Sequence, residues 1–138
     1  MALTLAWGLG AGIAIVLVDL LASEITRGIT DTDLAAAIWL LDLLVNLGLC
    51  GLAGYRVALA RRELRSGLEA AVLAGLLAGS GGLAYQLARS GEVMEPSEIV
   101  FLLAWNVVLA AAAGALGAWG GSSGRPDAPP GNDRGARR

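Results

Sequence analysis

Three polar residues, Asp42, Asn46 and Asn106, stand in otherwise apolar stretches of the chain and have the chemistry to bind a proton or a cation. Asp42 lies eight residues inside the apolar stretch 34–55, about 12 Å below its end by the rise of an α-helix. A charged side chain at that depth costs about 3 kcal/mol on insertion scales. Carboxylates kept inside a membrane commonly mark proton or ion pathways.

Asn46 follows Asp42 by one helical turn, so both side chains share a face. Asn106 reaches the same depth in the apolar stretch 99–119, on a helix that we expect to run in the same direction. The spacing therefore predicts a hydrogen-bonded cluster of Asp42, Asn46 and Asn106, provided that the two helices are neighbours. Desolvation favours the neutral carboxyl. Such a cluster is either a proton or cation site or a structural lock of a helix bundle.

Other kinds of chemistry find no support in the sequence. The chain has no histidine, and Cys50 is its single cysteine, so imidazole and thiolate metal clusters are excluded. The sequence holds no nucleophile–base pair and no phosphate-binding loop. We therefore predict no enzymatic activity, no cofactor, no metal site and no nucleic-acid partner.

Four apolar stretches must position these residues: 2–22, 34–55, 68–88 and 99–119. Each has about 20 residues, which matches a hydrocarbon core about 30 Å thick. The chain is 56% hydrophobic and 16% charged, against about 25% charged in soluble domains. We predict an all-α membrane protein with four transmembrane helices in residues 1–119, with the lipid bilayer as its main partner. Arginine without lysine, beside abundant Ala, Gly, Leu and Val, favours a bacterial source.

Arginines predict the orientation of the chain. Four lie in the linker, at Arg56, Arg61, Arg62 and Arg65, and four in the tail, whereas the loops 23–33 and 89–98 are acidic on balance. Arginine-rich short loops stay on the cytoplasmic side. Both termini are therefore predicted to be cytoplasmic, in the inner membrane, and residues 120–138 to form a disordered basic tail.

Small residues form stripes that predict helix packing. The stripes comprise Gly8, Gly12 and Asp19 in the first stretch, Gly48, Gly51 and Gly54 in the second, Gly75, Gly79, Gly82 and Gln86 in the third, and Gly114 and Gly117 in the fourth. The second stretch, with glycines opposite Asp42, is predicted to be the most enclosed. The stripes serve contacts within the chain or, alternatively, a homodimer or larger membrane complex.

The chain also shows signs of an internal repeat. A shift of 67 residues aligns Gly8 with Gly75 and Gly12 with Gly79, and a shift of 66 aligns Trp39 with Trp105. This pattern predicts two tandem parallel helical hairpins, as in some transporters.

The segment from Gly51 to Arg56, followed by a basic turn and the glycine-bearing segment from Arg65 to Gly79, resembles small four-span prokaryotic membrane proteins of unknown function. The resemblance covers about 30 residues, and it implies four spans and no assigned activity. Two functions follow as hypotheses. The first is a non-catalytic accessory or scaffold component that acts through helix packing. The alternative is a small transporter or channel subunit with Asp42, Asn46 and Asn106 as its proton or cation site.

Overall fold

The computed structural model of the chain describes residues 1–90 and 94–123. These residues form four helices, α1 (Ala2–Thr26), α2 (Thr32–Arg61), α3 (Leu64–Ser90) and α4 (Pro96–Ser123). All four are long and apolar enough to cross a membrane. The predicted all-α fold with four candidate membrane spans is therefore confirmed.

The ends of the helices follow from local chemistry. The Asp31 carboxylate caps α2, because it accepts hydrogen bonds from the backbone N–H groups of Asp33 and Leu34. Arg62 follows the last residue of α2 with a φ of 55°, the left-handed conformation that commonly ends a helix. Pro96 occupies the first position of α4, where its missing N–H costs nothing.

All four helices extend beyond the predicted spans. Helix α2 continues to Arg61 and α3 begins at Leu64, so the basic linker 56–65 is mostly helical. Helix α4 continues to Ser123, so the prediction of disorder from residue 120 is wrong for residues 120–123. The reason is that Gly121 packs against the backbone of Tyr55 in α2. The rest of the predicted tail, residues 124–138, lies outside the described residues.

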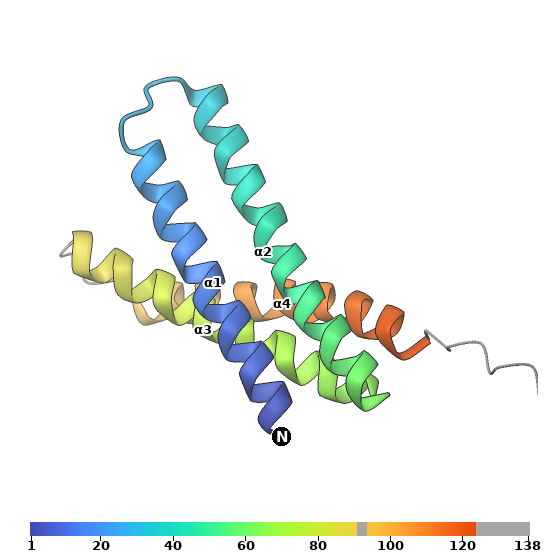
Figure 1. Cartoon of the computed structure of the whole chain (residues 1–138). Helices are drawn as coiled ribbons and strands as arrows, with labels where there is room; N and C mark the ends of the chain where they lie inside the picture. Colours follow the sequence, from blue (N-terminus) through green and yellow to red (C-terminus); the bar gives the residue numbers. More distant parts are fainter. Residues whose placement is uncertain (91–93, 124–138) are drawn as a thin grey trace, which may run out of the picture.

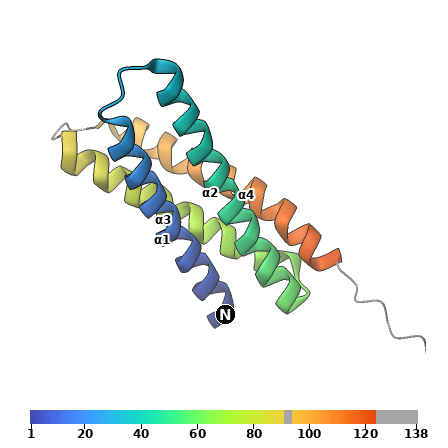
Figure 2. The same cartoon turned by 45° about the horizontal axis from the view of Figure 1, so that its top comes forward.

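The helices form two hairpins that lie across each other (Figure 1). Helix α1 packs on α3, α2 packs on both α3 and α4, and within the described residues α1 makes no contact with α4. The N-terminus, the α2–α3 turn and the end of α4 lie at one end of the molecule (Figure 2). The α1–α2 connection, the end of α3 and the start of α4 lie at the other, which we call the Arg89 end.

Small side chains fill the contacts between the helices. Among the described residues, ten of the thirteen buried hydrophobic residues that form the core are alanines, and the largest fully buried side chain is Val57. Without a hydrophobic driving force in lipid, such small residues allow the close backbone approach that holds membrane helices together. A Cβ atom on Gly54 would lie 2.6 Å from the carbonyl oxygen of Gly114.

Helix α3, rather than α2, is the most enclosed helix, with 39% of its most apolar segment buried against 11% for α2. The prediction for α2 is wrong because one broad face of that helix, including Trp39, Leu40 and Leu44, points outward. The helices of the proposed repeat also differ in their contacts, since α2 touches α3 whereas α1 does not touch α4 among the described residues. The duplication stays a prediction.

Candidate functional site

A polar cluster lies between α1 and α2, and a hydrogen bond across the two helices is its main contact. The Asn46 Nδ2 group donates to Asp19 Oδ1 at 2.6 Å. The carboxyl groups of Asp19 and Asp42 also lie within hydrogen-bonding reach of each other. We call Asp19, Asp42 and Asn46 the carboxyl cluster.

Asp42 is the most buried member of the carboxyl cluster, with 8% of its surface exposed. Its Oδ1 atom and the Oδ1 atom of Asn46 are buried and have no hydrogen-bond partner among the described residues. A buried polar atom without a partner costs free energy comparable to a lost hydrogen bond. The carboxyl cluster therefore has unused hydrogen-bonding capacity inside an apolar part of the protein.

Asp19 continues the stripe of α1 that Gly8 and Gly12 begin. Gly8 and Gly12 bring α1 onto α3, since a Cβ on Gly12 would lie 2.7 Å from Leu77. Asp19 lies seven residues beyond Gly12, about 10 Å further along the helix. There it faces α2, where Asp42 and Asn46 share a face because they are one turn apart.

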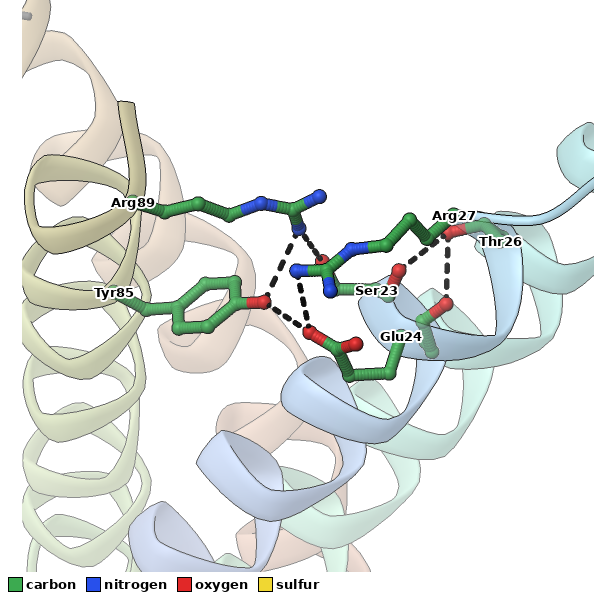
Figure 3. A network of polar contacts seen from close by, with 7 residues as sticks. Ser23, Glu24, Thr26, Arg27, Tyr85 and Arg89 are labelled. Atoms are coloured by element: carbon green, nitrogen blue, oxygen red, sulfur yellow. Dashed lines mark hydrogen bonds and ion pairs between the residues drawn. The ribbon is translucent and has the colours of Figure 1, made fainter. Parts of the chain in front are cut away.

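A second polar network joins α1 to α3 at the Arg89 end (Figure 3). The Tyr85 hydroxyl donates to Glu24 Oε1 at 2.7 Å, and an Arg89 guanidinium nitrogen donates to the Ser23 hydroxyl at 3.3 Å and to the Tyr85 hydroxyl at 3.1 Å. Arg27 pairs with the same Glu24 oxygen at 2.9 Å. Ser23 is one helical turn beyond Asp19, so this network begins where the carboxyl cluster ends.

Asn106 does not join the carboxyl cluster, and the predicted Asp42–Asn46–Asn106 arrangement is wrong in this respect. Its side-chain nitrogen donates to the backbone oxygen of Leu102 on its own helix at 2.9 Å. Its side chain also lies against Gly79 of α3. The depth of Asn106 was consistent with the prediction, but its face of α4 is turned toward α3.

The predicted packing glycines divide into two groups. Those that lie against a neighbouring helix are Gly8, Gly12, Gly51, Gly54, Gly75, Gly79, Gly114 and Gly117. Gly48 and Gly82 face open space, with no atom within 4 Å of a Cβ built on either. A packing role for these two does not hold within the chain, because they lie on faces that no other helix covers. Gln86 is exposed near the end of α3.

The four arginines of the linker lie at the end of the molecule opposite the Arg89 end. Arg56 lies over the ring of Trp7, with its Cζ atom 5.9 Å from the ring centroid. Arg65 pairs with Glu69 at 2.9 Å, and Arg61 and Arg62 are exposed at the end of α2. The linker arginines from which the orientation was predicted therefore lie together at one end of the helices.

Sequence reasoning missed Asp19 as a partner of Asp42, and it missed Gly67, Gly81 and Gly121 as close contacts. The full lengths of the helices, which extend beyond the apolar stretches, place Asp19 and Asp42 at similar depths. Asp19 lies seven residues before the end of α1 and Asp42 ten residues after the start of α2, so by the helical rise their depths differ by only about 5 Å.

Within residues 1–90 and 94–123, no group of three or more His, Cys, Asp and Glu side chains has a geometry that suits a metal ion. Comparison with known proteins finds no matching family model, no matching curated protein and no matching solved structure. A function can therefore be inferred only from the chemistry of the carboxyl cluster.

Proposed function

We propose that this protein is a small proton transporter or channel subunit of the inner membrane, with four spans, both termini cytoplasmic, and the Asp19–Asp42 pair as its proton-binding site. The observation that carries the proposal is the buried Asp42 carboxyl, which lies beside a second carboxyl and has one oxygen without a partner among the described residues. A lone intramembrane acid would be weaker support, because a pair can hold and pass on a proton.

Electrostatics favours one shared proton in this pair. Two neighbouring ionised carboxylates repel each other strongly in a medium of low dielectric constant, so a proton bound by the pair relieves this repulsion. The Asn46 amide donates to Asp19, which stabilises Asp19 as the ionised member. Asp42 is then the protonated member, and its O–H group can donate to Asp19.

A proton suits the carboxyl cluster better than a larger cation. Calcium takes about six to eight oxygen ligands, more than two carboxyl groups and one amide supply. A proton needs a single donor and a single acceptor. The polar network of Ser23, Glu24, Tyr85 and Arg89 at the Arg89 end supplies further groups that can exchange protons with water.

The second candidate is the non-catalytic accessory or scaffold component, acting through helix packing as a homodimer or in a larger membrane complex. The same Asn46–Asp19 hydrogen bond favours it, because this bond ties α1 to α2 and needs no transported ion. In this case the Asp42 carboxyl is a neutral structural group.

Proton flux into vesicles separates the two candidates. Wild-type protein, Asp42→Asn and Asn106→Ala would be reconstituted with a pH-sensitive dye inside the vesicles, and folding would be followed by circular dichroism and size-exclusion chromatography. Asn106→Ala is the matched control, because it also removes a polar side chain from a membrane helix but lies outside the carboxyl cluster.

We expect wild type and Asn106→Ala to carry a proton flux down an imposed gradient and a folded Asp42→Asn to lose it. Folded wild-type protein without flux would contradict transport and favour the accessory role. Flux that persists in Asp42→Asn would place the proton pathway elsewhere. A flux that follows a sodium gradient instead would replace the proton by a cation.

A further inference from the structure

An apolar groove runs between α1 and α2 in the half of the molecule that carries Arg56. It has a volume of about 380 Å³ and is lined by alanines and Gly10 of α1, by Trp7, and by Leu49 and Leu52 of α2. The groove spans Ala6 to Ala14, a length of about 12 Å by the helical rise. That is less than half of a hydrocarbon core of about 30 Å, and Ala14 is the middle residue of α1, so the groove lies along the N-terminal half of that helix.

The size of the groove determines what can occupy it. The groove is open along one side, so a narrow acyl chain can lie in it, whereas a helix at least 10 Å across could only cover it from outside. A void inside a bilayer loses the van der Waals contacts of its walls. A single acyl chain fits the groove, and a helix of a second copy does not.

The positively charged side chain of Arg56 lies at one end of the groove. Leu49, Leu52 and Arg56 share one face of α2, and the Arg56 guanidinium lies over Trp7, which lines the groove. Among the described residues Arg56 forms no ion pair. The ion pairs in this part of the chain are Arg27–Glu24 and Arg65–Glu69. Arg56 is also exposed, so its guanidinium is available to an anion.

We propose that this groove binds one anionic phospholipid, with an acyl chain against Gly10 and Ala14 and its phosphate on Arg56 above Trp7. A guanidinium matches the oxygens of a phosphate through paired N–H groups. The proposal requires that the helices span a membrane and is independent of the proton site. The groove ends at Leu49, about one turn from Asn46, so the bound chain would end near the carboxyl cluster without contacting it.

The test measures lipid retained by the purified full-length protein. Protein in detergent micelles would be mixed with phosphatidylglycerol or with phosphatidylcholine of the same acyl chains, and bound lipid would be counted by native mass spectrometry. Arg56→Gln removes the cation, with Arg61→Gln as its control. Gly10→Leu fills the groove, because Gly10 has no atom within 4 Å of an added Cβ. Gly48→Leu is its control, since Gly48 is equally open but lies outside the groove.

We expect wild type to prefer phosphatidylglycerol about five-fold, from about 1 kcal/mol per arginine at an anionic headgroup. Arg56→Gln loses this preference, Gly10→Leu loses bound lipid of both kinds, and both controls behave as wild type. Inorganic phosphate alone does not bind, because the acyl chain contributes most of the contact. Full retention of lipid by Gly10→Leu, or an unchanged preference in Arg56→Gln, would overturn the proposal. A change of oligomeric state in Gly10→Leu would also overturn it, by assigning the groove to a second copy.

Discussion

Asn46 of α2 donates a 2.6 Å hydrogen bond to Asp19 of α1, and this bond joins the two helices within their apolar segments. Asp42 lies one turn from Asn46 on the same helix, within hydrogen-bonding reach of Asp19. Asp42 is therefore not a lone acid in the apolar segments. It is paired with Asp19, which the Asn46 amide holds in place. This pair is the proposed proton-binding site.

Asn46→Ala is expected to lower the free energy of unfolding by about 1 kcal/mol, the usual size of a side-chain hydrogen bond between membrane helices. The reason is that Asp19 loses its donor. Unfolding by a denaturing detergent would measure the change, with Gly48→Ala as a control on an open face of the same helix. Stability equal to that of wild type would contradict the role of this bond.

Gly54→Ala is expected to destabilise the fold by about 1–3 kcal/mol, as overpacking of a tight contact does. Its Cβ would lie 2.6 Å from the backbone oxygen of Gly114, which cannot move aside without shifting α4. Gly48→Ala, where a Cβ meets no atom, should leave stability unchanged. The same unfolding assay compares the two, and equal effects would show that α2 and α4 are not packed as described.

Arg89→Ala is expected to change stability by less than about 1 kcal/mol, although it removes two hydrogen bonds to Ser23 and Tyr85. These contacts are exposed, and exposed polar pairs contribute little because water competes for them. Thermal unfolding at low and high salt would measure this. A loss well above 1 kcal/mol would mean that this network is a main support of the α1–α3 contact.

Reporter fusions should place both the C-terminus and the α2–α3 turn in the cytoplasm and the segment 89–98 outside. Replacing Arg61, Arg62 and Arg65 together by glutamine should produce a mixture of orientations, because it removes most of the positive charge between the two hairpins. Alkaline phosphatase and green fluorescent protein fusions report the two sides. A C-terminus on the outer side of wild-type protein would refute the predicted orientation.

The number and type of elements could be predicted from the sequence because each helix is a continuous apolar stretch of membrane-spanning length. The glycines at 51 and 54 could likewise be expected at a close contact. Which helices are neighbours was a harder question, because it depends on how two hairpins dock. For this reason Asn106, at a suitable depth, turned out to face α3.

The contact of Asp19 with α2 could likewise not be predicted from the sequence. By the predicted stretches 2–22 and 34–55, Asp19 lay three residues from the end of its stretch and Asp42 lay eight residues in, and the place of Asp19 in a glycine stripe favoured a packing role. Helix extensions past the membrane boundary, such as α4 to Ser123, were also missed, because composition marks the apolar stretch and not the end of the helix.

Infrared spectroscopy of the carboxyl groups tests the shared proton most directly. The carbonyl stretch of a protonated carboxylic acid is separate from the bands of carboxylates, and it would be recorded at neutral pH for wild type, Asp19→Asn, Asp42→Asn and the exposed control Asp33→Asn. We predict the band in wild type and in Asp33→Asn, and its loss or shift in both variants of the pair. A wild-type spectrum without a protonated carboxyl band, or a band that neither pair variant changes, would contradict the proton-binding pair.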